Sequence, residues 1–214
     1  MSKSGIIRSH SHYQCRPFCE VAYFTRGVIY PKSMELPQGS EGIKILRANN
    51  ITLSGNTLNF DDVRIISAAA AIKDSQFLKK NDILICIGSG SREHVGKAAF
   101  IDEDMDFAFG GFMGALRVKK DLIPKYLFHV ITSTIFKRHL NRHSNSITIN
   151  NITNEVWKSF CLPVPPIRKQ EEIAAKIDSM INASDSLIDK LKSEITARTL
   201  QKDLLRDIII CGKQ

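Results

Sequence analysis

The chain has 214 residues and is 43% hydrophobic, which is enough for one sizeable domain with a buried core. No segment approaches the run of about 18 apolar residues that a membrane span requires. Residues 1–16 also lack the apolar stretch of a secretory signal peptide. Five scattered cysteines favour reduced thiols over a disulfide framework. We therefore expect a cytoplasmic protein with no membrane partner.

The positive charge is concentrated in the first three quarters of the chain. The net charge is +8, from 30 Lys and Arg against 22 Asp and Glu. Residues 167–214 hold nine basic and eight acidic side chains, which leaves 21 and 14, a net of +7, in residues 1–166. A basic module of this kind is typical of, though not specific to, proteins that bind a polyanion such as nucleic acid.

The first part of the chain is predicted to be rich in β-strands. Residues 43–50 (IKILRANN) begin with an alternating strand pattern and end in polar residues. A turn at 79–82 leads into a short buried strand over 83–87, and residues 95–101 form the return strand. The Gly-rich segment 109–118 leads into another strand, where glycine allows a bulge or close backbone approach.

Helices are predicted to follow. Pro124 suits the first turn of a helix that continues into a basic C-terminal end. Thr153 is placed to cap a short helix that runs through Trp157, and the prolines of segment 160–167 keep it extended. The apolar face of the first helix is expected to contain Leu127, Val130 and Ile131, together with Thr134.

Residues 169–210 contain no Pro or Gly and are predicted to form one helix, about 60 Å long at ~1.5 Å per residue. Apolar residues recur at alternating steps of four and three, which is a heptad pattern, and the phase shifts after the polar stretch 196–199. A domain of this size cannot cover such a helix, so we expect a partner helix from another chain. The expected contact positions are Ile177, Ile181, Ile188, Leu191 and Ile195, then Leu200, Leu204 and Ile208.

The sequence contains no motif that is typical of a catalytic or metal-binding site. The sequence has no phosphate-binding P-loop, no dinucleotide fingerprint and no Asn/Asp-Pro-Pro-Tyr/Phe stretch of amino-methyltransferases. We therefore predict no catalytic residue. Four possible ligands near the N-terminus match no common zinc finger, and we expect a frayed terminus rather than a metal site. These residues are His10, His12, Cys15 and Cys19.

Three segments carry residue types that contact DNA. The loop 88–92 (GSGSR) offers backbone N–H groups, hydroxyls and a cation, but it also suits a plain hairpin connection. The cations near residue 140 suit phosphate, and equally a helix C-terminus. Segment 47–50 has the same ambiguity, since its residues are common in turns. The candidates are Arg47, Asn49, Asn50, Ser89, Ser91, Arg92, Lys97, Lys137, Arg138, Arg142, His143, Asn145, Ser146 and Thr148.

Three stretches resemble the specificity subunit of type I restriction-modification enzymes. Residues 162–173 (LPVPPIRKQEEI) resemble its Pro-rich boundary motif, which is followed by Glu/Lys-Gln and the start of a helix. Residues 79–97 resemble its Gly-Asp-Ile-Leu…Gly-Ser…Gly-Lys segment, with Asn81 in place of the usual Gly, and residues 45–51 resemble an early Leu-Arg-x-x-Asn-Ile strand. The similarity covers roughly residue 42 to the C-terminus and leaves the start of the domain open.

The resemblance implies an α+β fold. A mixed α/β target recognition domain with a β-rich part would span residues 1–166, and the long helix, residues 167–214, would form an antiparallel coiled coil with a partner helix. Such a subunit reads one half of a split target in double-stranded DNA and is not itself an enzyme. Methyltransferase subunits carry S-adenosylmethionine and the adenine chemistry, and a separate restriction subunit cuts, so no cofactor is expected in this chain.

One recognition domain and one helix stand here where the family usually has two of each. The chain thus resembles either a half-length subunit that dimerises or pairs with a second half, or a piece of a full one. The two apolar stripes of the helix could serve a sister helix and a methyltransferase subunit separately. Two alternatives remain: the recognition portion of a fused methyltransferase or restriction enzyme, and a helical scaffold without DNA binding. The lack of catalytic motifs in a chain that begins with Met favours the recognition subunit.

Overall fold

The computed structural model describes residues 13–52, 54–143 and 151–212, without the side chains of Arg92 and Cys211. The chain divides into two compact units, Met1–Glu171 and Glu172–Gln214. The first unit contains all the strands and the short helices, and the second consists of most of one long helix. Strands and helices are therefore both present, as the α+β prediction requires.

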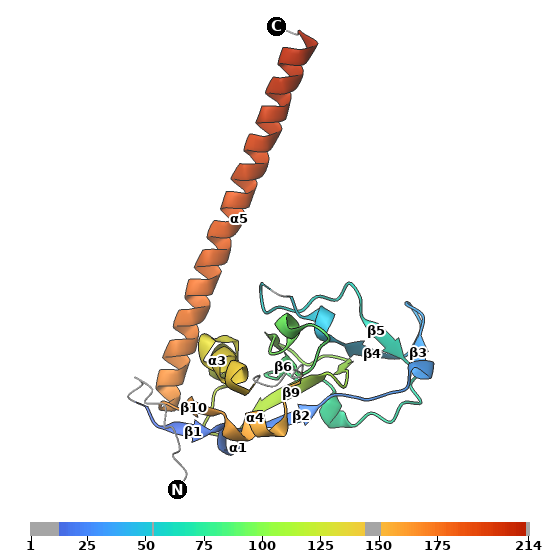
Figure 1. Ribbon diagram of the computed structural model, residues 1–214, viewed down its shortest axis with the longest axis vertical. Helices are drawn as coiled ribbons and strands as arrows, with labels where there is room; N and C mark the ends of the chain where they lie inside the picture. Colours follow the sequence, from blue (N-terminus) through green and yellow to red (C-terminus); the bar gives the residue numbers. More distant parts are fainter. Residues whose placement is uncertain (1–12, 53, 144–150, 213–214) are drawn as a thin grey trace. The chain divides into compact units, whose positions relative to one another are not determined.

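Two four-stranded sheets form the centre of the first unit (Figure 1). The strands of the first sheet, in spatial order and all antiparallel, are β2 (Ala22–Arg26), β9 (Met113–Val118), β6 (Ile83–Cys86) and β7 (Ala98–Phe100). Those of the second are β3 (Glu35–Leu36), β5 (Arg64–Ile66), β4 (Ile43–Leu46) and β8 (Phe107–Phe109). The β4–β8 pair is parallel, and a three-residue turn connects β8 to β9, so the chain passes from one sheet to the other there.

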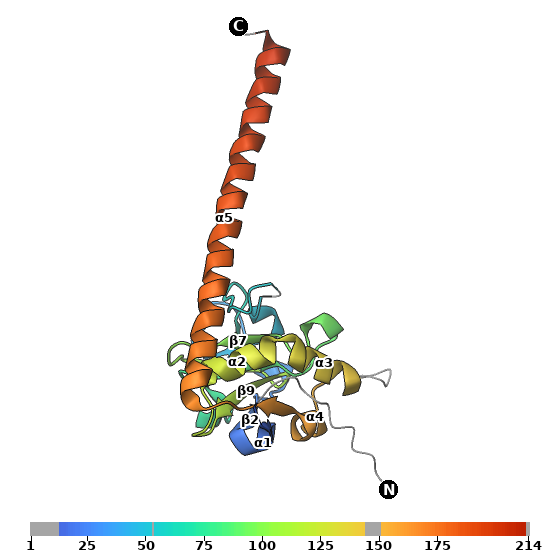
Figure 2. The ribbon, with the colours of Figure 1, turned by 90° about the vertical axis from the view of Figure 1, so that its left-hand side faces the viewer.

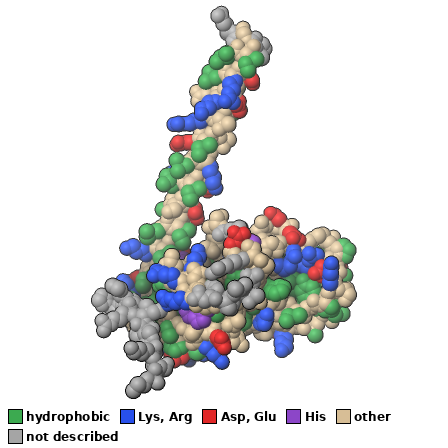
Figure 3. All heavy atoms as spheres, viewed as in Figure 1, with side chains coloured by type: hydrophobic (Ala, Val, Ile, Leu, Met, Phe, Trp, Pro, Cys, Tyr) green, Lys and Arg blue, Asp and Glu red, His purple; other side chains and the backbone are tan. Residues whose placement is uncertain are grey.

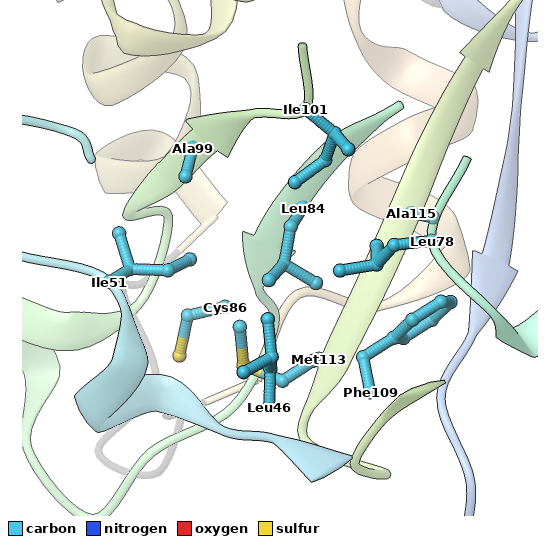
Figure 4. Close-up of a cluster of buried hydrophobic side chains, with 10 residues drawn as sticks. All are labelled: Leu46, Ile51, Leu78, Leu84, Cys86, Ala99, Ile101, Phe109, Met113 and Ala115. Carbon is cyan, nitrogen blue, oxygen red and sulfur yellow. The ribbon is translucent and has the colours of Figure 1, made fainter. Parts of the chain in front are cut away.

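One hydrophobic core cluster draws side chains from both sheets (Figure 4). Leu46 and Phe109 come from the second sheet and meet Leu84 and Met113 of the first. Every residue of β6 is buried, which explains why its sequence, ILIC, is apolar without alternation. Burying a side chain of this size stabilises the fold by about 1.5–3 kcal/mol.

Helices cover one face of the first sheet. Helix α2 (Pro124–Thr132) packs against β7 and β9 (Figure 2), and α3 (Thr134–His143) follows it directly. A short α4 (Asn154–Ser159) and a one-turn α1 (Phe18–Val21) lie against each other. Aromatic rings join these helices: the Trp157 ring lies 4.8 Å from Phe18 and 5.4 Å from Phe136, measured between centroids.

The two ends of the first unit pair with each other. Strand β1 (Cys15–Pro17) runs antiparallel to β10 (Cys161–Pro163), with Arg16 opposite Leu162. Phe18 and Val21, just after β1, are fully buried. The domain therefore includes residues 15–26, which lie in the region before residue 40 whose place the sequence left open.

Several predicted elements are confirmed, and one needs correction. The strands predicted at 43–50, 83–87 and 95–101 exist as β4, β6 and β7. The Gly-rich entry into a strand predicted over 109–118 is also confirmed, since Gly110 and Gly111 turn the chain from the end of β8 into β9. The helix predicted from Pro124 breaks at Ser133, whose extended backbone (ψ 168°) separates α2 from α3.

The other sequence predictions in this region concern single residues. Thr153 occupies the N-cap of α4 but makes no capping hydrogen bond with its side chain. Asn81 has φ of 72°, in the left-handed region. Asn tolerates this conformation better than most residues other than Gly, which explains why Asn can stand where relatives of this pattern have Gly. Four short 3₁₀ helices in the described chain lie between the strands: Lys32–Met34, Ala48–Asn50, Asp74–Gln76 and Arg92–His94.

The predicted long helix is confirmed as α5 (Ile167–Cys211), 45 residues in length. Its first turn is fixed to the first unit by Gln170, whose side chain is fully buried. The Gln170 amide donates to the carbonyls of Asp121 (2.9 Å) and Pro165 (2.8 Å) and accepts a 2.8 Å hydrogen bond from the Ile123 N–H. Both N–H donors of this amide and its carbonyl oxygen are thereby hydrogen-bonded.

The rest of α5 carries exposed apolar side chains among charged ones (Figure 3). From Ile181 onward the predicted contact positions are between 43% and 66% exposed. Ile177, the first of them, is partly buried. No helix in the described chain has the length and apolar character needed to cross a membrane.

Candidate nucleic-acid interface

The β6–β7 loop, residues 88–96, lies at the centre of the predicted DNA-contact clusters. At its end the Lys97 ammonium donates hydrogen bonds to the carbonyls of Ala48 (2.9 Å) and Ile51 (2.6 Å). The turn that carries Arg47, Asn49 and Asn50 is therefore held against the base of this loop.

On its other side the loop meets the end of α3 and the chain that follows it. Gly88 forms an isolated β-bridge with Asn151, and the Ile152 N–H donates to the Ile87 carbonyl at 2.6 Å. Gly96 lies so close to α3 that an added Cβ would stand 2.8 Å from Leu140 Cδ1. Three segments far apart in the sequence are thus contiguous. We call residues 47–50, 88–96 and 137–143 the loop surface.

Two of the predicted DNA contacts have internal roles, and we remove them from the interface. Asn50 is 1% exposed; its amide donates to the carbonyls of Asn59 (2.8 Å) and Asp62 (3.1 Å) and accepts from the Arg47 N–H (2.8 Å). Lys97 is 8% exposed, and burial lowers the pKa of its ammonium group. Polar residue types alone do not distinguish such internal hydrogen bonds from surface ones.

Arg47 and Asn49 remain at the surface and share one carboxylate. Arg47 Nη2 lies 2.8 Å and Asn49 Nδ2 3.0 Å from Asp62 Oδ2, and the Asp62 side chain is 59% exposed. An exposed ion pair contributes only about 0–1 kcal/mol, so a DNA phosphate or base edge can replace it at little cost.

The serines of the loop are partly exposed, and their hydroxyls make local contacts. Ser89 Oγ accepts a 3.1 Å hydrogen bond from the Ser91 N–H, and Ser91 Oγ donates to Glu93 at 3.2 Å. The backbone of Arg92 begins a 3₁₀ turn, Arg92–His94. These short bonds shape the loop without burying it, so hydroxyl and backbone groups remain near the surface.

Three exposed cations, Lys137, Arg138 and Arg142, stand on α3. The Arg138 guanidinium bonds back to Thr134, 3.2 Å from its Oγ1. His143 bridges the His139 carbonyl and Ser159 Oγ, each at 3.0 Å, so it joins α3 to α4. Burial lowers the pKa of His139, which favours its neutral form. Asn145, Ser146 and Thr148, also predicted to contact DNA, lie outside the described residues.

Large apolar side chains beside the loop surface were not anticipated. Phe112 is 65% exposed and Ile29 is 80% exposed. The sequence marks segment 109–118 as Gly-rich, but its spacing does not reveal that Phe112 points outward from a turn. Of the four N-terminal residues considered as metal ligands, Cys15 and Cys19 are exposed, and His10 and His12 lie outside the described residues. The described part of the chain contains no group of three or more His, Cys, Asp or Glu residues suited to a metal ion.

Comparison with known proteins identifies the family of this chain. Residues 16–197 match the family described as the type I restriction modification DNA specificity domain. The chain is 32% identical over 178 residues to the specificity subunit of the type I restriction enzyme StySPI of Salmonella potsdam, covering 82% of this chain and 38% of that protein. It is 30% identical over 172 residues to the EcoKI specificity subunit of Escherichia coli K12, covering 79% and 36%.

Solved structures agree on the fold. The HsdS subunit from Thermoanaerobacter tengcongensis matches with a TM-score of 0.62 at 17% identity, over 91% of this chain and 44% of that one. A chain from a study of assembly and conformational transition in the type I R-M system matches with a TM-score of 0.66 at 19% identity, over 91% and 45%. The chain thus spans less than half the length of these relatives. It belongs to the family of type I restriction-modification DNA specificity domains.

Proposed function

We propose that this chain reads one half of a bipartite DNA target and is the specificity component of a type I restriction-modification complex. The observation that carries the proposal is the meeting of three DNA-capable segments in the loop surface. Lys97 ties the turn 47–50 to the base of loop 88–96, and Gly96 of that loop lies against Leu140 of α3. Family membership supports it, because the matching domain is named for DNA specificity.

The proposed division of labour within the loop surface follows from chemistry. Lys137, Arg138 and Arg142 neutralise phosphates, which provides affinity but no sequence information. Asn49 and the hydroxyls of loop 88–92 face base edges, where amide and hydroxyl groups distinguish donors from acceptors. Sequence preference therefore resides in the two loops, and affinity in α3.

The proposal includes partners and assigns no catalysis to this chain. Methyltransferase subunits would contribute S-adenosylmethionine and the methyl transfer, and a restriction subunit would join through them. The apolar stripes of α5 support pairing with a second helix, either from an identical copy or from another specificity half, in antiparallel orientation. Two identical halves related by a two-fold axis would read an inverted repeat.

The phosphate contacts are tested by Arg138→Ala with Arg142→Ala. With the methyltransferase partner present, we expect weaker binding to all duplexes, and a slope of log K against log salt reduced by about 1 for each lost phosphate contact. Fluorescence anisotropy at several salt concentrations measures both. Lys190→Ala is the control, since it removes an exposed cation from the second unit. An unchanged slope in the double variant would remove α3 from the interface, and no binding of the wild type at low salt would refute the proposed function.

A further inference from the structure

Phe112 and Ile29 are large apolar side chains that are mostly exposed to solvent. They are 65% and 80% exposed and lie on adjacent turns, since an added Cβ on Gly111 would stand 2.8 Å from Ile29 Cγ1. Scattered exposed apolar residues are ordinary in proteins, so exposure alone implies nothing. Two features distinguish this pair: the backbone that carries Phe112 is held by hydrogen bonds, and Phe112 lies next to the loop surface.

The turn that carries Phe112 is fixed from three directions. Its Gly110 N–H donates to the Leu46 carbonyl at 2.9 Å, which ties it to the second sheet. The Phe112 carbonyl accepts from the N–H groups of Ile87 (2.9 Å) and Gly88 (3.1 Å), which ties it to the end of β6. On the Ile29 side, Val28 donates to the Phe109 carbonyl at 2.7 Å. A partner would meet a turn whose backbone is already fixed, so that only the side-chain torsions of Phe112 would lose freedom on binding.

Phe112 also borders the loop surface directly. An added Cβ on Gly88 would stand 3.0 Å from the Phe112 ring, so this ring borders the GSGSR loop. An added Cβ on Gly110 would stand 3.8 Å from Arg47 Cγ, on the other arm of the surface. The Arg26 guanidinium donates to the Gly111 carbonyl at 3.3 Å and adds a cation.

We propose that Phe112, supported by Ile29, contacts the C5-methyl group of a thymine in the major groove. This inference rests on the proposed function and names a base feature that the loop surface reads. The thymine methyl is the one apolar group that base pairs present in that groove. An apolar side chain beside the Arg47/Asn49 turn and the Ser89/Ser91 loop matches a base edge, where the methyl lies beside hydrogen-bonding groups.

The surroundings favour DNA over a protein as the occupant. Two cations stand near the turn that carries the ring: the Arg26 guanidinium donates to the Gly111 carbonyl at 3.3 Å, and Arg47 Cγ would lie 3.8 Å from a Cβ added on Gly110. Cations beside a single apolar side chain suit DNA, which offers phosphates next to the methyl group of a base edge.

The test uses the full chain assembled with its methyltransferase partner. The half-site is first selected from random duplex DNA, and each thymine in it is then replaced by deoxyuridine, which removes only the methyl group. For the wild type we expect one or two thymines whose replacement weakens binding by about three- to tenfold, as expected for a buried methyl group. In Phe112→Ala the thymine duplex is bound more weakly, and the same replacement has no further effect.

Two variants control for folding and for general aromatic effects. Phe112→Leu keeps an apolar side chain and should keep sensitivity to deoxyuridine. Tyr23→Ala removes another exposed aromatic, placed on β2 opposite Arg117, and should behave as the wild type.

The outcomes separate this inference from the proposed function. If a sequence is selected but contains no thymine, or if no replacement weakens binding by the wild type, the methyl contact is wrong while DNA recognition stands. A Phe112→Ala chain that no longer assembles with the methyltransferase would overturn the inference in favour of a protein contact. If no sequence is selected at all, both fail together.

Discussion

The double substitution Ile188→Asp with Leu191→Asp should convert a dimer of this chain into monomers. Both side chains stand in the apolar stripe of α5, at 46% and 50% exposure. In a paired helix they would be buried against the partner, and two carboxylates there would have to lose their hydration without a counter-ion. Analytical ultracentrifugation over a range of concentrations measures the change, and we expect the dimer dissociation constant to rise by at least about 100-fold.

Ser186→Asp provides the matched control. It adds one carboxylate to the same helix, where the double variant adds two, but on the face opposite the stripe in the heptad pattern. This variant should associate as the wild type does. A double variant that still dimerises as tightly as the wild type would show that α5 is not the contact between copies.

Asp82→Ala should have the largest effect on the stability of the first unit. The Asp82 side chain is only 4% exposed and forms an ion pair with Arg117. Arg117 Nε and Nη2 each donate to a different carboxylate oxygen at 2.7 Å. This hydrogen-bonded pairing raises the pKa of Arg117. Arg117 also donates to the carbonyls of Ser75 and Phe77, so one guanidinium joins β9 to the turn before β6.

Removing the carboxylate leaves a largely buried cation without its counter-ion. Breaking a buried pair in this way lowers the free energy of unfolding by about 3–5 kcal/mol. Urea denaturation followed by far-UV circular dichroism measures the loss. Asp62→Ala is the control, because its carboxylate is 59% exposed in the pair with Arg47, and we expect about 0–1 kcal/mol there. Equal losses in the two variants would contradict the role given to burial.

Periodicity predicted the elements whose signal is local. Helix α5 is the clearest, since 42 residues without Pro or Gly and with heptad spacing leave few alternatives to a helix. The buried strand β6 followed from a short apolar run after a turn. The positive φ of Asn81 was implicit in its place within a pattern that usually has Gly.

Long-range pairing was beyond local patterns. Nothing in residues 15–26 indicates that β1 pairs with β10 or that β2 pairs with β9, because those partners lie about 90 to 150 residues away. The break between α2 and α3 depends on Ser133, a residue compatible with a helix interior.

The candidate site could be predicted only in part, because its assembly also depends on contacts between segments far apart in the sequence. Residue types identified three segments, and only the fold shows that Lys97 and the approach of Gly96 to Leu140 bring them together. Lys97 and Asn50 are not surface residues, since the side chains of both donate hydrogen bonds to backbone carbonyls inside the protein. Exposure of Phe112 depends on a turn between two sheets, which no local pattern encodes.

Selection of bound sequences from random duplex DNA by the chain assembled with its methyltransferase partner tests the central claim most directly. If two identical halves read the target, the selected sequences will contain one short motif twice, as an inverted repeat with a constant spacer. A single motif would point to pairing with a different specificity half. Sequences no different from the starting pool would contradict the claim that this chain confers DNA specificity.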